Sequence, residues 1–197
     1  MKPLVYTLCA AALVATSPAT AKWTTMPETV PVAVAKSEMT VVAGPGWNQN
    51  STRPFPKGET WSIDGPLLNT IDFYAGIGAG ESLAKERDKK RKPLPKFAVD
   101  MLPTDIAQLY EQTARIMLGT SEFSVDSIEP TTFLNRPGFK FSYHYTTPDE
   151  ELTRNGEAQG VVTDKKLYLI AFNAAALYYF KTGLPSAHLV MASASLK

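Results

Sequence analysis

Residues 138–145 read GFKFSYHY, and the alternation in this stretch decides the expected fold. Successive side chains of an extended strand point to opposite faces, so every second residue lies on the same side. One face of this strand carries only aromatic rings, from Phe139, Phe141, Tyr143 and Tyr145. The other face is polar and includes His144. The pattern predicts a sheet strand with one aromatic face in a core.

More strands are predicted on both sides of this one. Residues 157–163 and 166–172 form a predicted hairpin that turns at Asp164-Lys165. Before residue 138, residues 122–128 alternate, and so do residues 67–74. Three glycines are expected to end the 67–74 strand: Gly76, Gly78 and Gly80.

Residues 104–118 form the best predicted helix. We expect Thr104 to cap it, Asp105 to favour its positive end, and Gly119 to stop it. Its apolar stripe consists of Ile106, Leu109, Tyr110, Thr113, Ile116 and Met117. At the end of the chain we expect a helical turn over 174–181, a break at 183–185 and a terminal helix over 186–195.

The chain divides by composition into three parts. Residues 1–21 read as a signal peptide, 22–66 as a Pro- and Trp-rich arm, and 67–197 as the main part of the same domain. Two short strands are expected in the arm, at 38–43 and 59–63, with turn chemistry at 48–51. The fold class is therefore α+β, a mostly antiparallel sheet flanked by helices.

The C-terminal third resembles the PsbP-like α/β/α sandwich family. The resemblance rests on residues 139–143, on 166–172, on Tyr178-Tyr179-Phe180 and on the closing Ser193-Ala194-Ser195-Leu196. Members of that family are small exported or lumenal proteins and bacterial lipoproteins, generally noncatalytic. The resemblance implies a sandwich fold and a binding or assembly role, and it transfers no functional residue.

Residues 1–21 carry the three parts of a secretory signal. Met1-Lys2 is basic, 4–14 is apolar, and Ala19-Thr20-Ala21 is a cleavage motif. The apolar run is shorter than the about 20 residues of a membrane span, although a retained anchor is the alternative. Cys9 follows a leucine, which excludes a lipoprotein site. We expect a periplasmic or secreted protein, cleaved near Ala21, with no cysteine and no transmembrane span in its mature chain.

Charge and motifs exclude several classes of function. Without Lys2 the mature chain has 19 basic and 19 acidic residues, so we expect no nucleic-acid partner. The glycines of 76–80 lead to Glu81, where a dinucleotide fingerprint needs a glycine, so this segment is interpreted as a turn. With two histidines far apart in sequence, His144 and His188, no metal site and no cofactor are expected.

The sequence offers two candidate binding surfaces. Residues 85–96 form a predicted exposed loop with seven basic and two acidic residues, centred on Lys89, Lys90, Arg91 and Lys92. It is either a solvated loop or a docking surface for an anionic envelope surface or an envelope protein. The second is an aromatic face of Phe141, Tyr143, Tyr145 and Tyr168, which is either core or a ligand groove.

No catalytic constellation is evident in the sequence, which favours a noncatalytic protein. The leading hypothesis is a noncatalytic binding or assembly protein of the cell envelope. The first alternative is an envelope hydrolase that uses His144. The second is a carrier of a small molecule or lipid that uses the aromatic face.

Overall fold

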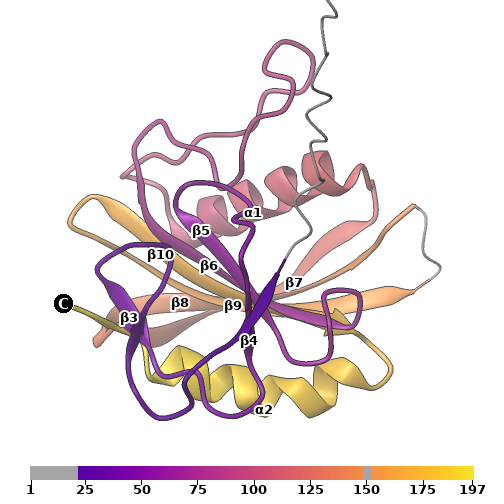
Figure 1. Cartoon of the computed structure of the whole chain (residues 1–197). Helices are drawn as coiled ribbons and strands as arrows, with labels where there is room; N and C mark the ends of the chain where they lie inside the picture. Colours follow the sequence, from indigo (N-terminus) through magenta and orange to yellow (C-terminus); the bar gives the residue numbers. More distant parts are fainter. Residues whose placement is uncertain (1–21, 149–151) are drawn as a thin grey trace, which may run out of the picture.

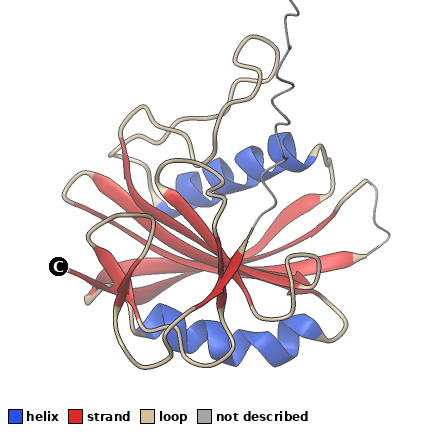
Figure 2. Ribbon diagram, in the orientation of Figure 1, coloured by secondary structure: helices blue, strands red, loops and turns tan. Residues whose placement is uncertain are grey.

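In a computed structural model, which describes residues 22–148 and 152–197, the chain forms three layers. An eight-stranded sheet lies in the middle, with helix α1 (Pro103–Leu118) on one face and helix α2 (Tyr179–Ala192) on the other, as Figures 1 and 2 show. This arrangement confirms the predicted α+β class. The predicted signal peptide and the acidic segment 149–151 lie outside the described residues.

The sheet is antiparallel at every pairing. Its strand order is β1-β4-β5-β6-β10-β9-β8-β7. The bounds are β1 (Trp23–Thr25), β4 (Asn48–Asn50), β5 (Gly58–Ser62), β6 (Asn69–Gly78), β7 (Phe123–Phe133), β8 (Arg136–Thr146), β9 (Thr153–Thr163) and β10 (Lys166–Ala175). A smaller sheet, in the order β11-β3-β2, joins β2 (Val32–Ala33) and β3 (Met39–Val41) to β11 (Ser195–Leu196).

The hairpin between β9 and β10 turns where the sequence predicts it. Asp164 and Lys165 both have positive φ, 51° and 61°, as a two-residue turn between right-twisted strands requires. The aromatic row of β8 also lies on one face, buried beneath α1. The central strands of the sheet are therefore those that the alternation predicts.

Helix α1 begins at Pro103, one residue before the predicted start. Its N-cap is Leu102, whose N–H donates to the Asp105 carboxylate at 2.8 Å, so the expected cap at Thr104 is wrong. Proline is favoured in the first helical position because that N–H has no helical partner. Gly119 ends the helix with φ 68°, as predicted.

Helix α2 runs without a break through the segment where the sequence predicts one. Pro185 lies inside the helix and is exposed. The carbonyl of Lys181, which loses its helical partner, is also on the exposed side, where water can bond to it. Gly183 lies on the buried side, where a Cβ would stand 2.8 Å from the Phe172 ring. Packing on the sheet thus keeps the helix intact.

The arm is more regular than expected. Residues 48–50 form strand β4 and not a turn, and five strands lie within 22–66. Strand β6 continues past Tyr74 and Gly76, and it ends at Gly78, one of the three glycines predicted to end it. The indole rings of Trp47 and Trp61 are fully buried in the core on the α2 side of the sheet.

Two cores result, one on each face of the sheet. The α1 side contains Ile106 and Leu109 of the helix and the aromatic row of β8. The α2 side contains the arm, the small sheet and Val190. None of the helices in the described residues is long and apolar enough to span a bilayer.

Candidate functional site

A cavity of about 210 Å³ lies between α1 and the sheet. Its wall is mainly apolar, and six of its sixteen lining residues are aromatic: Phe55, Phe73, Tyr74, Tyr110, Phe123 and Tyr145. Four polar or charged residues also border it: Glu59 of β5, Asp72 of β6, Thr113 of α1 and Asn173 of β10. An apolar cavity with a few convergent polar groups is the usual form of a small-molecule site.

A hydrogen-bond network holds the Asp72 carboxylate in place. The hydroxyl of Thr60 donates to it at 2.6 Å, the hydroxyl of Thr70 at 3.2 Å, and the side-chain amide of Asn173 at 3.2 Å. Asn173 is itself oriented by the hydroxyl of Tyr145, which donates to its oxygen at 2.8 Å. Within the described part of the chain, all the donors to this acid are therefore neutral.

Desolvation raises the pKa of Asp72 above its ordinary value, and the three hydrogen bonds partly oppose that shift. The side chain is half-buried, and it borders the cavity. No ion pair to Asp72 is found among the described residues. An acid with a raised pKa at the edge of an aromatic cavity is a feature of binding and catalytic sites.

Three phenols on the α1 side of the sheet also have shifted pKa values. Burial raises the pKa of Tyr74, Tyr110 and Tyr143 well above the ordinary value of 10.0. The hydroxyls of Tyr110 and Tyr143 bond to each other at 3.0 Å. These phenols stay neutral and serve as hydrogen-bonding and packing groups.

The structure separates the four residues of the predicted aromatic face. Only Tyr145 borders the cavity. Phe141 and Tyr143 are fully buried beneath α1, and Tyr168 lies in the core on the opposite face of the sheet. Asp72 was not predicted from the sequence as a site residue. Its signal was an acid within an alternating strand, on the same face as Thr70 and Tyr74.

His144 lies away from the cavity, on the polar face of β8. Its Nδ1 is 2.7 Å from the Asp126 carboxylate, and both side chains are about half exposed. Ser142, two residues away on the same face, bonds to Ser127 at 2.8 Å. His144 thus has a carboxylate partner, and within residues 22–148 and 152–197 it makes no hydrogen bond to a serine.

His188 is paired in the same way with Glu157, at 2.7 Å. Within 22–148 and 152–197, no group of three or more His, Cys, Asp or Glu side chains is placed to hold a metal ion. Both histidines therefore form two-membered pairs with carboxylates on the surface.

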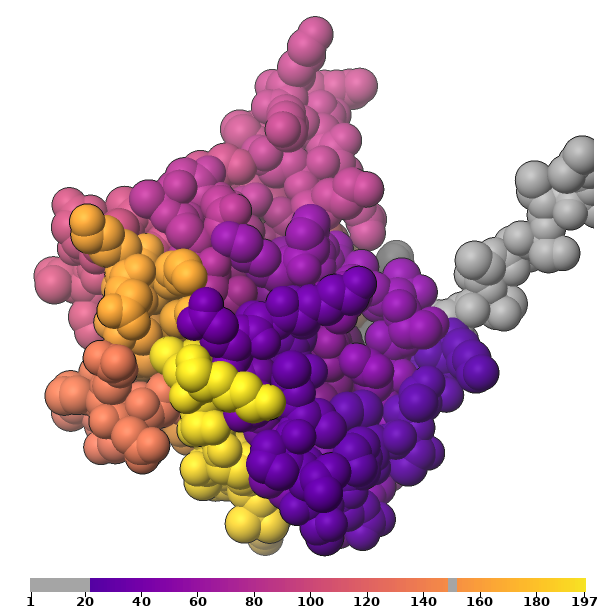
Figure 3. Space-filling model, turned by 60° about the vertical axis from the view of Figure 1, so that its left-hand side comes forward, coloured from indigo at the N-terminus to yellow at the C-terminus, as the bar shows by residue number. Residues whose placement is uncertain are grey.

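The basic loop, residues 85–96, stands on a closed stem. The N–H of Gly80 donates to the Phe97 carbonyl at 2.9 Å, and the N–H of Phe97 donates to the Glu81 carbonyl at 2.8 Å. Leu83 and Phe97 are buried in the α1-side core. Figures 1 and 3 show the loop rising from the body beyond α1.

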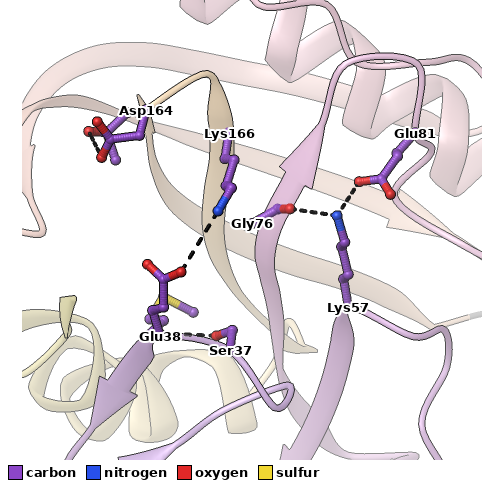
Figure 4. A network of polar contacts seen from close by, with 9 residues as sticks. Ser37, Glu38, Lys57, Gly76, Glu81, Asp164 and Lys166 are labelled. Atoms are coloured by element: carbon purple, nitrogen blue, oxygen red, sulfur yellow. Dashed lines mark hydrogen bonds and ion pairs between the residues drawn. The ribbon is translucent and has the colours of Figure 1, made fainter. Parts of the chain in front are cut away.

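Glu81 makes a second connection at the foot of the loop. Its carboxylate accepts the N–H of Gly78 at 2.6 Å and pairs with Lys57, whose ammonium also donates to the Gly76 carbonyl at 2.9 Å (Figure 4). The Lys57 hydrogen bond is the main cause that lowers the pKa of Glu81. A phosphate loop would offer a backbone N–H of this kind to its ligand, but here the Gly78 N–H is bonded to the Glu81 carboxylate.

Within the basic loop, the acidic side chains organise the turn. The Glu86 carboxylate pairs with Lys96 at 2.8 Å, which is the first cause of its lowered pKa, and accepts the N–H of Leu94 at 3.2 Å. Asp88 accepts the N–H of Arg91 at 3.1 Å.

The cations at the tip extend into solvent. The side chains of Lys89 and Arg91 are 78% and 88% exposed, and their acid partners lie at 3.8 and 3.2 Å. Lys90 and Lys92 are exposed and have no acid partner in the described part of the chain. The predicted docking residues are thus presented together on an anchored loop.

No family model matches the chain, and no curated protein matches its sequence. Among solved structures, the chain is similar to cyanobacterial PsbP (CyanoP) from Synechocystis sp. PCC 6803. The TM-score is 0.52 and the identity 11%, over 95% of this chain and 98% of that one. It is also similar to the Ran-binding protein Mog1p of Saccharomyces cerevisiae, with TM-score 0.50 and 10% identity, over 90% of this chain and 95% of that one. Identities this low show a shared fold alone, so the likeness to PsbP holds at the level of the fold.

Proposed function

We propose that this chain is an exported, noncatalytic binding or assembly protein of the cell envelope, which docks through the basic loop onto an anionic surface. The observation that carries the proposal is the anchored tip with Lys89, Lys90, Arg91 and Lys92 in solvent. The signal predicted in residues 1–21 supports the location.

The anchoring of the loop favours docking over a merely solvated segment. A flexible loop would lose conformational entropy on binding, whereas a preorganised one loses little. Here Glu86 and the buried Leu94 hold the base, and Asp88 holds the turn. The two acids also neutralise only part of the positive charge, since seven basic side chains lie in the loop.

The likeness to PsbP is a likeness of fold. Because one fold hosts many functions, it gives only general support to a noncatalytic role. The hydrolase alternative has weaker support. His144 and Asp126 form a pair, but the exposed position excludes little water, and a nucleophile would have to join them.

Vesicle sedimentation tests the docking surface. We expect the protein to bind vesicles with phosphatidylglycerol and not neutral phosphatidylcholine vesicles, and we expect salt to weaken the binding. Changing Lys89, Lys90, Arg91 and Lys92 together to Gln should reduce binding by roughly two to three orders of magnitude, since each basic residue near a membrane contributes about 1 kcal/mol.

A matched control changes four exposed lysines elsewhere to Gln: Lys36, Lys165, Lys181 and Lys197. This variant loses the same net charge and should keep most of the vesicle binding. The docking proposal is wrong if both variants lose binding equally, or if the unchanged protein ignores anionic vesicles. In the latter case a crosslink from the loop to an envelope protein would identify a different kind of partner.

A further inference from the structure

The cavity under α1 has a charge imbalance that the fold itself does not resolve. Asp72 borders it and is held by Thr60, Thr70 and Asn173, which carry no charge. Neutral donors stabilise a carboxylate but leave its net charge in place. A partly buried anion without a cation is unfavourable, so a ligand that supplies positive charge would gain a strong interaction there.

The other acid at the cavity does not share this property. Glu59 is 1% exposed, and its carboxylate accepts the N–H groups of Ala35 at 2.9 Å and of the Trp61 indole at 2.7 Å. It also lies 3.5 Å from the Arg53 guanidinium. Asp72 is therefore the acid with charge left to offer.

The wall of the cavity selects the kind of cation. Aromatic rings attract alkylammonium and quaternary ammonium groups, and several rings around one site form the cage that recognises them. Tyr74 packs against Tyr110 edge to face at 6.0 Å, and Phe123 stacks on Tyr145 at 5.5 Å, so the rings are mutually braced. A calcium ion would instead need six to eight oxygen ligands, which this apolar wall does not supply.

The size of the cavity limits the ligand. Drug-sized pockets span about 300–1,000 Å³, and this one is about 210 Å³. We infer that the cavity binds a small organic ammonium cation, with Asp72 opposite the positive charge and the aromatic rings around its alkyl groups. This site is separate from the basic loop, so it does not depend on the proposed docking.

Nuclear magnetic resonance titration with choline chloride tests the inference on the purified protein. The comparison ligand is dimethylbutanol, the neutral analogue in which carbon replaces the quaternary nitrogen. We expect choline to bind at least about tenfold more tightly than the alcohol, with shift changes confined to the cavity. Equal affinity for the two ligands, or no binding of choline at millimolar concentration, overturns the inference.

Two variants test the residues. Asp72→Asn keeps the shape and removes the charge, and it should weaken choline binding about tenfold or more. Ala114→Leu, on the cavity wall, keeps the charge and fills space, and it should also weaken binding. Asp126→Asn is the matched control, because it removes an acid outside the cavity and should leave the affinity unchanged. Unchanged affinity in a folded Asp72→Asn protein would show that the acid is not the binding group.

Discussion

At the scale of single residues, small side chains decide which rings can pack on the sheet. Gly156 of β9 lies opposite Tyr143 of β8, and a Cβ there would stand 2.1 Å from the tyrosine ring. Gly160 likewise lies opposite Phe139, and a Cβ there would stand 2.8 Å from the phenylalanine ring. The aromatic row of β8 can therefore lean across β9 because the facing positions are glycines.

Asp72 gives the molecule a specific dependence of stability on pH. Burial raises the pKa of Asp72 in the folded state. At pH values above the ordinary pKa of 3.8, the native state therefore holds this proton more tightly than the unfolded state does. By linkage, the contribution of this group to the free energy of unfolding falls as pH rises through the folded-state pKa. We expect the stability of Asp72→Asn, relative to the unchanged protein, to rise as pH increases above 3.8.

Urea unfolding at several pH values measures that difference. Asp126→Asn is again the control, and its stability relative to the unchanged protein should not show this rise. A flat difference between Asp72→Asn and the unchanged protein would mean that the carboxyl titrates alike in the folded and unfolded states.

At the scale of elements, α1 and β8 together exclude water from a layer of phenols. The helix supplies Tyr110, and the strand supplies Tyr143, which bonds to it. Burial raises the pKa of both, and of Tyr74 on β6. We expect these three phenols to stay neutral at pH values near 10, where exposed tyrosines ionise.

Absorbance at the phenolate band during an alkaline titration tests this expectation. The pKa values of these phenols are raised in the folded state. Their protonated rings therefore contribute fully to the free energy of unfolding below the unfolded-state pKa of about 10, and this contribution is lost as pH rises further. The late part of the absorbance change should therefore coincide with loss of circular dichroism. Full ionisation of the tyrosines near pH 10 with the fold intact would contradict the buried layer.

At the scale of the whole molecule, the first described residues complete the second core. Trp47 and Trp61 are fully buried among residues of β6, β10 and α2, and Met39 and Val41 lie with them. The arm also supplies β1, β4 and β5 to the main sheet. Removing it would expose one face of β6 and the inner side of α2.

We therefore expect a fragment of residues 67–197 to fail to fold. Loss of one buried tryptophan side chain costs about 3–5 kcal/mol, and whole domains are stable by only about 5–15 kcal/mol. A control deletion of residues 89–92, at the exposed tip of the basic loop, should leave a cooperative thermal transition. A cooperative transition in the 67–197 fragment would show that residues 22–66 are a separate unit.

The sequence by itself determined the elements whose pattern is local. Alternation over 138–145 predicted β8 and its aromatic face, helical spacing predicted α1, and Asp164-Lys165 marked the turn of the β9–β10 hairpin. These signals work because a strand or helix buries one face at a period that the chain itself records.

Only the tertiary structure decided the features that depend on distant neighbours. Strand β4 exists because β1 and β5 pair with it, and α2 continues through Pro185 because the sheet holds its other side. The cavity joins Asp72 to Tyr110 and Tyr145, which are far apart in the chain. No local period records such a meeting, because packing and strand order bring these residues together only when the three layers close.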